Sequence, residues 1–275
     1  MVRLFDRYNK DVIGHVSERA GKTLKRRIAI VVITLITYHL SLITSLAATK
    51  ADADSAYVQG NYQKAIELYS DILSEGQSAD VYYNLGNAYY RTEEITQAIL
   101  AYERALLLSP GDADIRFNLQ LARTKTIDKM VPQSEFFVVT WYRSLVNQFS
   151  VDGWAYMSLV LLAAAIILAL LYLFSSPVWL RKVGFFGGVL ALLLFGLANL
   201  FAWQQKQTLT HRDGAIVIQS AVPVKSTPAT NGTDLFILHE GTKVFVTDDT
   251  MSDWKEIRMP DGKVGWVETS QIEII

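Results

Sequence analysis

The pattern of apolar and polar residues divides the chain into three long apolar stretches and two regions of shorter periodicity. The apolar stretches cover residues 28–48, 154–174 and 183–203. The second and third contain no charged side chain, and each has the length of about 20 residues with which a helix crosses a membrane. Apolar residues recur with helical spacing between residues 51 and 125 and alternate with polar residues after Ala215. The pattern therefore predicts a helical domain, two membrane helices and a β domain.

The first apolar stretch has the features of a secretory signal. It follows a cluster of Lys and Arg residues and ends in Ser45-Leu46-Ala47, which fits the small residues of a cleavage site. We therefore expect residues 1–48 to be a basic lead with a signal peptide cleaved near Ala47. The length also fits an uncleaved signal anchor, and this alternative stays open. Both interpretations place the chain from residue 50 onward outside the cytoplasm.

The other two apolar stretches predict a transmembrane hairpin over residues 154–203. Their connector, residues 175–182, is short and contains Arg181 and Lys182. Because short cationic loops stay in the cytoplasm, the segments on both sides of the hairpin lie on the same outer face. Aromatic residues suited to the two membrane interfaces flank the stretches: Trp154 and Trp203 at the outer ends, Tyr172 and Trp179 near the inner ends.

Gly184 and Gly188 lie about one helical turn apart in the third stretch. Small residues at this spacing let membrane helices approach closely. Glycine is also common in membrane helices in general, so the pair alone does not establish such a contact.

Composition and charge favour a membrane protein and exclude one class of partner. Hydrophobic residues make up 51% of the chain and charged residues 19%. The net charge of −1 conceals segments of alternating sign: +5 for residues 1–48, −5 for 49–153, +2 for 154–203 and −3 for 204–275. The acidic segments lack the clustered Lys and Arg that bind phosphate backbones, so we expect no nucleic-acid partner.

The side chains that usually hold metals are scarce. The chain has no cysteine, which excludes disulfides, thiolate sites and iron–sulfur clusters. Metal ligands usually come in closely spaced sets, so we expect no metal site and no cofactor. The four histidines are far apart: His15, His39, His211 and His239. The acidic group Asp248, Asp249 and Asp253 lacks the ligand spacing and the glycine of a calcium loop, which favours a solvated hairpin tip.

A repeat with a period near 34 residues spans the predicted helical domain. NYQKAIELYSDIL (61–73) and EITQAILAYERAL (94–106) align at an offset of 33 residues. The frame has an aromatic residue, Leu-Gly, Tyr, Ala, an aromatic residue, Ala and Pro in order, and it resembles the tetratricopeptide repeat (TPR). The resemblance implies antiparallel helix pairs that pack through small residues. The residues with this structural role are Tyr82, Leu85, Gly86, Tyr89, Ala98, Tyr102, Ala105 and Pro110.

The repeat frame also defines the extent of the array. The match is full over residues 79–111 and partial over residues 51–78, which lack the final proline. The residues after Pro110 predict one capping helix, as short arrays need, so that the array covers residues 51–125.

The segment VYYNLGNAYYR (81–91) contains two tyrosine pairs that we expect to divide between packing and binding. In the TPR frame, Tyr82 and Tyr89 face inward. The resemblance implies a concave groove that binds a peptide segment of a partner, and an ordinary solvated face is the alternative. The residues expected in the groove are Tyr83, Asn87, Tyr90, Arg91, Phe117 and Leu121.

Residues 126–153 form a linker with a predicted amphipathic helix. Pro132 interrupts the preceding helix. Apolar residues then repeat every four positions, at Phe137, Trp141, Leu145 and Phe149. Such a helix lies at the membrane surface before the first span, or it packs against the repeats.

Residues 212–275 predict a small all-β domain of five strands, with turns at Asn231-Gly232 and Pro260-Asp261-Gly262. Val-x-Val-Lys-Ser, Gly-Thr-x-Val, Trp-x-x-Ile and Asp-Gly-x-x-Gly-Trp-Val together resemble the bacterial SH3-like family. The resemblance implies a small barrel, and members of this family often bind cell-wall peptides or proteins. Its structural residues would be Trp254, Ile257 and Trp266 in or near the core, Gly262 in a turn and Gly265 at a backbone bend.

The order of these parts, with TIDK-x-x-P and EFF-x-x-x-W between the repeats and the hairpin, resembles the BatE-type proteins of the Bacteroidetes aerotolerance operon over residues 51–275. The long basic lead before Ile28 departs from that family. The resemblance implies a bacterial inner-membrane protein with its TPR and SH3-like domains in the periplasm. It also implies a stress-related complex with a MoxR-type ATPase and von Willebrand factor A-type membrane proteins.

The sequence thus predicts a multidomain membrane protein with an α-helical TPR array, two transmembrane helices and a C-terminal all-β SH3-like barrel. The first functional hypothesis is a non-catalytic scaffold for protein–protein interaction. The second is a cell-wall sensor whose SH3-like domain binds peptidoglycan. We expect no catalytic residue, because G-x-x-x-x-G-K-[ST], H-E-x-x-H and G-x-S-x-G are absent and no general base accompanies the tyrosines.

Overall fold

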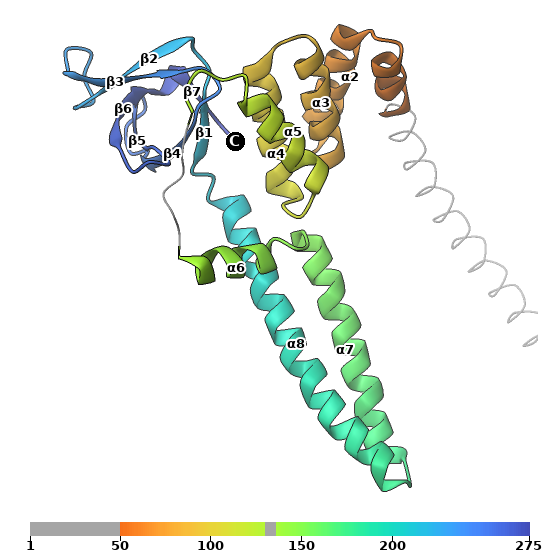
Figure 1. Ribbon diagram of the computed structural model, residues 1–275. Helices are drawn as coiled ribbons and strands as arrows, with labels where there is room; N and C mark the ends of the chain where they lie inside the picture. Colours follow the sequence, from red (N-terminus) through yellow and green to blue (C-terminus); the bar gives the residue numbers. More distant parts are fainter. Residues whose placement is uncertain (1–49, 130–135) are drawn as a thin grey trace, which may run out of the picture. The chain divides into compact units, whose positions relative to one another are not determined.

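The computed structural model describes residues 50–129 and 136–275, and the predicted signal segment, residues 1–48, lies outside this part of the chain. Residues 53–275 form one compact unit. In chain order it contains a group of short helices, two long helices and an antiparallel sheet (Figure 1).

The helical array consists of two helix pairs and a final single helix. A helix over residues 50–58 precedes α2 (Tyr62–Glu75), α3 (Ala79–Arg91) precedes α4 (Ile95–Leu108), and α5 (Ala113–Arg123) follows. Side-chain oxygens cap two of these helices at their N-termini. Asn61 accepts a hydrogen bond from the Lys64 backbone N–H, and Asp112 accepts from the first turn of α5. Pro110 lies in the turn between α4 and α5, where a proline cannot continue the preceding helix.

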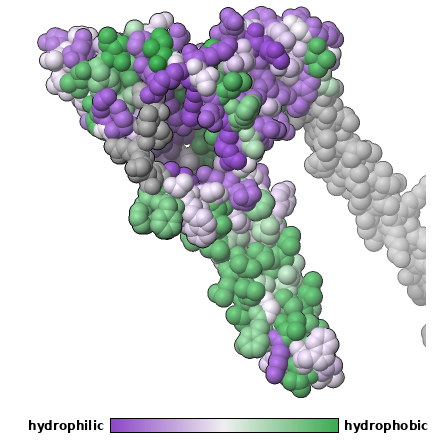
Figure 2. All heavy atoms as spheres, in the orientation of Figure 1, coloured by the Kyte–Doolittle hydropathy of each residue, from purple (hydrophilic) through white to green (hydrophobic). Residues whose placement is uncertain are grey.

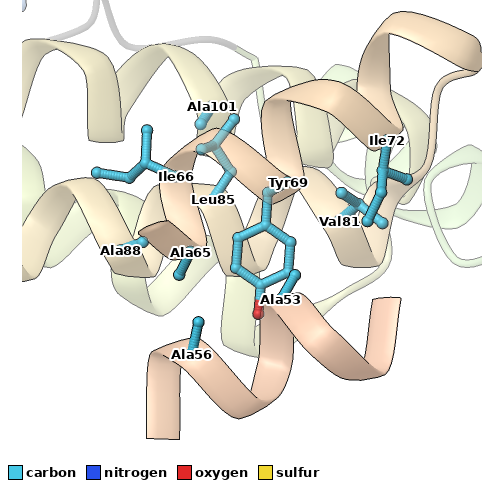
Figure 3. Close-up of a cluster of buried hydrophobic side chains, with 10 residues drawn as sticks. All are labelled: Ala53, Ala56, Ala65, Ile66, Tyr69, Ile72, Val81, Leu85, Ala88 and Ala101. Carbon is cyan, nitrogen blue, oxygen red and sulfur yellow. The ribbon is translucent and has the colours of Figure 1, made fainter. Parts of the chain in front are cut away.

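Small residues allow the first repeat to pack closely around one aromatic ring. Figure 3 shows Tyr69 pointing from α2 toward the helix that carries Ala53 and Ala56. Ala65 and Ala88 are fully buried in the same cluster. Because each alanine leaves space for a neighbouring side chain, the close packing of the interior is kept without strain.

The buried hydroxyl of Tyr69 also forms part of a hydrogen-bonded contact between successive repeats. We call such a contact, in which two side chains share one acceptor oxygen, a joint. Tyr69 donates a hydrogen bond to Oδ1 of Asp54 at 2.6 Å. Asn84, in the next helix pair, donates to the same oxygen at 3.1 Å. The hydrogen bonds satisfy a buried polar group and connect α3 to the first repeat.

The same joint recurs one repeat later. Tyr102 donates to Oδ1 of Asn87 at 2.7 Å, and Asn118 of α5 donates to that oxygen at 2.9 Å. The second joint therefore attaches the final helix in the way that the first attaches α3. A shared acceptor at each step gives the array a defined register between successive helices.

Gly86 of α3 lies against the ring of Tyr102. A Cβ atom at Gly86 would be 2.6 Å from the ring carbons Cδ1 and Cε1. The adjacent Leu85 is buried, as are Ala98 and Ala105 on α4. Packing thus explains the Leu-Gly pair of the repeat, because the leucine side chain fills the core and the glycine leaves room for the Tyr102 ring.

The two long helices, α7 (Val151–Phe174) and α8 (Val178–Thr210), pack against each other as a hairpin. Both are long and apolar enough to cross a membrane, and Figure 2 shows a mainly apolar surface on them. A Cβ atom at Gly184 would be 2.7 Å from backbone atoms of Leu168 and Tyr172, whereas Gly188 has ordinary van der Waals space. The helix contact therefore requires glycine at Gly184 and not at Gly188.

The connector of the hairpin is shorter than predicted. Only residues 175–177 separate the helices, so Arg181 and Lys182 lie in α8 and not in a loop. Proline favours the start of a helix, because its φ angle is already suitable and it has no N–H to satisfy, so α8 begins directly after Pro177. At its other end α8 continues beyond Trp203 to Thr210.

The linker contains a helix, α6 (Phe137–Val146), which packs against the C-terminal part of α8. Tyr142 donates a hydrogen bond to Oε1 of Gln204 at 2.5 Å. Gln205 donates to the carbonyl oxygens of Val146 and Phe149 at 2.8 and 2.7 Å. Large apolar side chains on α6 and just after it remain exposed, namely Phe137, Trp141, Leu145 and Phe149. Val138, Val139 and Tyr142 of the same helix are exposed as well, and the position of α6 at a membrane surface stays a prediction.

The C-terminal region forms one antiparallel sheet of seven strands, where the sequence predicted five. Their order is β3-β2-β6-β5-β4-β1-β7. The first predicted run, residues 215–226, is split into two strands, and residues 272–274 add a further one. Closure of the sheet into a barrel stays a prediction. The bounds are β1 (Gly214–Val217), β2 (Ala221–Lys225), β3 (Asp234–His239), β4 (Lys243–Asp248), β5 (Trp254–Arg258), β6 (Val264–Glu268) and β7 (Ile272–Ile274).

The structural residues predicted in the sheet divide into three environments. Ile257 is fully buried in the core cluster of the sheet, whereas Trp254 and Trp266 are half-buried. Gly262 has a φ angle of 90° and occupies the predicted turn. A Cβ atom at Gly265 would be 2.4 Å from Cγ1 of Val224, so the glycine permits close approach of β2 and β6 rather than a bend.

The array and the sheet, predicted as separate domains, contact each other through one hydrophobic cluster, and each also has a cluster of its own. Ile216 of β1 and the C-terminal Ile275 are buried in a cluster with residues of α4 and α5, including Ile99 and Ile115. Gly241 lies at this boundary with a φ angle of 79°, and a Cβ atom there would be 3.1 Å from Ile99 Cδ1. The backbone of the β3–β4 turn therefore contacts the array directly.

Charged side chains connect the same two regions. Glu103 on α4 is only 4% exposed and pairs with Arg123 of α5 and with Lys243 of β4, the latter at 2.8 Å. Arg104, the next residue, pairs with Glu273 of β7 at 2.8 Å. A buried carboxylate is costly unless it is paired, so the position of Glu103 depends on partners from both regions.

A third connection joins the end of the array to the β3–β4 turn. The Asp128 carboxylate accepts hydrogen bonds from the backbone N–H of His239 at 2.7 Å and from the Thr242 hydroxyl at 2.8 Å, and His239 Nδ1 lies 3.0 Å away. Burial alone would raise the pKa of Asp128, but these hydrogen bonds outweigh it, and the pKa is lowered. Asp128 belongs to the TIDK motif, which thereby has a structural role.

We predict that Gly86→Ala lowers the free energy of unfolding of the full chain by about 1–3 kcal/mol, because the added methyl group overlaps the Tyr102 ring. Gly76→Ala is the matched control, since nothing lies within 4 Å of a Cβ atom there and its φ angle of 178° is extended. Denaturant unfolding in detergent measures both. Equal stabilities of the two variants would contradict the packing account.

Candidate functional site

The six residues predicted for a binding groove lie on two adjacent helices of the array. Four come from α3 and two from α5. Asn118 of α5 joins the helices by donating hydrogen bonds to Tyr83 at 3.0 Å and to Asn87 at 2.9 Å. We call the surface formed by Tyr83, Tyr90, Arg91, Phe117, Leu121 and Lys125 the α3–α5 face.

The outer part of the α3–α5 face combines apolar and cationic groups. Phe117 is 67% exposed and Leu121 is 41% exposed, although both are large apolar side chains. Lys125 places its Nζ atom 4.5 Å from the centre of the Tyr90 ring. Arg91 is exposed, and hydrogen bonding with Tyr57 raises its pKa. The face therefore combines exposed apolar groups with two cationic side chains, Lys125 beside Tyr90 and Arg91 beside Tyr57.

Two of the predicted groove residues are engaged inside the protein. Asn87 holds its side-chain oxygen between Tyr102 and Asn118. Tyr83 accepts from Asn118, and its ring centre lies 6.0 Å from that of Tyr102. Asn87 therefore has a structural role that its predicted place in the groove did not include.

The tyrosine pairs do not divide sharply into inward and outward residues. Tyr82, Tyr83, Tyr89 and Tyr90 are all half-buried. Tyr82 and Tyr89 border a cavity of about 320 Å³ between α2, α3 and α4, on the other side of α3 from Asn118. All four tyrosines pack against the same hydrophobic cluster, and helix α5 and Lys125 cover part of Tyr83 and Tyr90.

The buried Tyr69 and Tyr102 act as hydrogen-bond donors. Burial raises the pKa of Tyr102, and burial together with the nearby Asp54 carboxylate raises the pKa of Tyr69. Burial likewise raises the pKa of Tyr89. These phenols stay protonated at neutral pH, so this cluster supports packing and recognition rather than proton abstraction.

The sequence frame did not identify Lys125, a member of the α3–α5 face, or Asn118, which links α5 to α3 beneath it. A signal for Asn118 was present, because it follows Asn84 by 34 residues and occupies the same joint one repeat later. Lys125 lies after the last helix of the array, where the repeat pattern no longer applies.

The acidic group at the β4–β5 hairpin has a local structural role. The Asp248 carboxylate accepts a hydrogen bond from the Thr250 backbone N–H at 2.9 Å, which lowers its pKa. Ser252 donates to Asp253 at 3.2 Å. Within residues 50–129 and 136–275, no three His, Asp or Glu side chains are placed to hold a metal ion together.

Comparison with known families identifies one repeat of the array. Residues 79–112, which cover α3, α4 and the turn before α5, match the tetratricopeptide repeat family. A search of curated proteins finds no match to the chain. The tetratricopeptide repeat is a non-catalytic module of protein–protein interaction, and its match includes four of the six predicted groove residues.

We predict that Asn87→Ala lowers the free energy of unfolding by about 1–3 kcal/mol, because it leaves the buried Tyr102 hydroxyl without its acceptor. Phe117→Ala should change it by less than about 0.5 kcal/mol, since this side chain is mostly exposed. Unfolding curves of both variants test whether Asn87 belongs to the internal joint and Phe117 to the exposed surface. A larger loss for Phe117→Ala than for Asn87→Ala would reverse that assignment.

Proposed function

We propose that this protein is a membrane-held scaffold that binds a segment of a partner protein on the α3–α5 face. The observation that carries the proposal is the exposure of Phe117 and Leu121 on a surface whose underlying side chains are fixed by the Asn87–Tyr102–Asn118 joint. Exposed large apolar groups on a rigid support are typical of interaction sites. The TPR match at residues 79–112 supports a protein as the partner.

The chemistry of the face indicates the kind of segment that it accepts. Phe117 and Leu121 lie one helical turn apart on α5 and provide an apolar contact strip. Arg91 and Lys125 carry positive charge beside it, so an acidic or C-terminal carboxylate on the ligand would be stabilised. The preferred ligand is therefore a peptide with apolar side chains next to a carboxylate.

The membrane part of the proposal is supported by the two apolar helices, α7 and α8. The cationic residues Arg181 and Lys182 near the hairpin turn favour a cytoplasmic turn, with the array and the sheet in the periplasm of a bacterial inner membrane. The exposed apolar residues of α6 are suited to the interface on the periplasmic side.

The proposed protein family rests on the resemblance of the sequence to BatE-type proteins of the Bacteroidetes aerotolerance operon. Under this proposal the partners are von Willebrand factor A-type membrane proteins that act with a MoxR-type ATPase. The seven-stranded antiparallel sheet supports an SH3-like domain, whose proposed role is to hold the array through the shared hydrophobic cluster. Peptidoglycan binding by the sheet stays a prediction from the sequence.

The experiment is site-specific photocrosslinking in native membranes with the full chain. A photoreactive residue at Phe117 should crosslink to a von Willebrand factor A-type protein, whereas the same residue at Glu67, exposed on α2, should not. Arg91→Ala with Lys125→Ala should reduce the Phe117 crosslink by about tenfold or more. Crosslinks of equal yield at Phe117 and Glu67, or no effect of the double substitution, would refute the proposed site.

A further inference from the structure

A cavity of about 1190 Å³ lies away from the α3–α5 face, between the end of the array, α6 and the sheet. Residues of α5 and the segment after it form one wall, β4 and the β5–β6 turn form another, and Arg143 of α6 and Asp213 complete the lining. The cavity is larger than the usual range of about 300–1,000 Å³ for small-molecule sites and is partly open. It therefore has room for a group larger than a water cluster.

The lining of the cavity is strongly cationic. Among the described residues, two carboxylates line it, Asp128 and Asp213, and Asp128 is already engaged by His239. The whole chain carries a net charge of −1, so the local excess of positive charge is not a general property of the molecule. The described part of the lining contains six basic side chains, Arg116, Arg123, Lys129, Arg143, Lys243 and Arg258.

Internal ion pairs account for only part of this charge. Arg123 and Lys243 share the single carboxylate of Glu103. Arg116 donates hydrogen bonds to the carbonyl oxygens of Pro110 and Gly111, at 2.9 and 3.1 Å, and these acceptors carry no charge. Among the described residues no carboxylate pairs with Arg258. A surplus of positive charge thus faces the cavity.

Stabilisation of helix ends explains some of these cations but not the group as a whole. Lys129 donates to the carbonyl oxygens of Thr124 and Thr126, both at 2.7 Å, beside the C-terminal end of α5, where a cation is favourable. Arg116 lies near the N-terminal end of the same helix, where a cation is unfavourable. Arg258 lies on a strand, which has no comparable dipole. These two arginines require another reason.

The cavity also has an apolar side and an edge beside α8. Leu106, Phe245 and Met259 line it together with the basic residues. Arg143 is on α6, whose neighbouring residue Tyr142 bonds to Gln204, just after the apolar stretch of α8 ends. A ligand with a charged head and an apolar part would match both components of the lining.

We propose that this cavity binds a phosphate-bearing anionic group. A phosphate group presents several strong acceptor oxygens, which suit the planar donors of arginine, and four of the six cations are arginines. Two sources have this chemistry, the head group of an anionic phospholipid and a free phosphate compound. The apolar lining favours the lipid. The lipid source rests on the proposed membrane placement, whereas the anion site itself does not.

The test uses the full chain in neutral detergent with two probes. Inorganic phosphate is added at constant ionic strength and its effect on thermal unfolding is measured. Retention of phosphatidylglycerol relative to phosphatidylcholine is measured separately by native mass spectrometry. Arg116→Gln with Arg258→Gln removes two charges from the cavity, and Lys64→Gln with Lys255→Gln removes two charges elsewhere.

The expected result is that the cavity variant loses about tenfold or more of the binding shown by the natural chain, and that the control variant loses less than about twofold. An effect confined to phosphatidylglycerol identifies the lipid head group, and an effect with inorganic phosphate identifies a free phosphate site. Binding of neither probe by the natural chain, or equal losses in the two variants, would overturn the proposal. Arg143→Gln alone, on the separate helix α6, provides a second test in case the double variant does not fold. It should also weaken binding.

Discussion

The buried carboxylate of Glu103 is the constraint on which the mutual arrangement of the helical array and the sheet depends. It lies on α4 with 4% of its surface exposed, and its two partners come from α5 and β4. A buried carboxylate is costly without a partner, and the partly exposed Arg123 and Lys243 together compensate the charge of Glu103. The pair geometry therefore requires that the helical array and the sheet keep one mutual position. Ile216 and Ile275 fill the apolar part of the same contact.

Because of this constraint, the array and the sheet are not two independent domains. Two modules joined by flexible linkers would present their surfaces independently, whereas a shared hydrophobic cluster presents them as one body. The Asp128 carboxylate adds a second fixed point, since it binds the β3–β4 turn from the segment that follows the array. The exposed Phe117 and Leu121 of the α3–α5 face are then carried on a support that includes the sheet. The proposed scaffold function rests on this rigidity, since a preorganised surface loses less entropy on binding.

Local sequence patterns predicted much of the fold, and long-range contacts account for what they missed. The helices of the array and the apolar hairpin follow from periodicity within about 30 residues, as do the Leu85-Gly86 and Tyr102 positions of the repeat. The contact between Glu103 and Lys243 connects residues 140 positions apart, and no pattern in either segment predicts it. The close contact between Gly265 and Val224 was not predicted for the same reason, because Val224 lies on a strand that is distant in sequence. Among the candidate site residues, Asn87 was expected in the groove, and the positions of Tyr102 and Asn118 show that its side-chain oxygen accepts hydrogen bonds inside the array.

Hydrogen exchange measured by mass spectrometry on the full chain in detergent tests most directly whether array and sheet form one cooperative unit. Peptides from α4 (Ile95–Leu108) and β4 (Lys243–Asp248) should open with the same free energy in the natural chain. Glu103→Gln should accelerate exchange in both, and Glu67→Gln, an exposed change on α2, should accelerate neither. Acceleration confined to α4, with β4 unchanged, would contradict the account and show two independent domains.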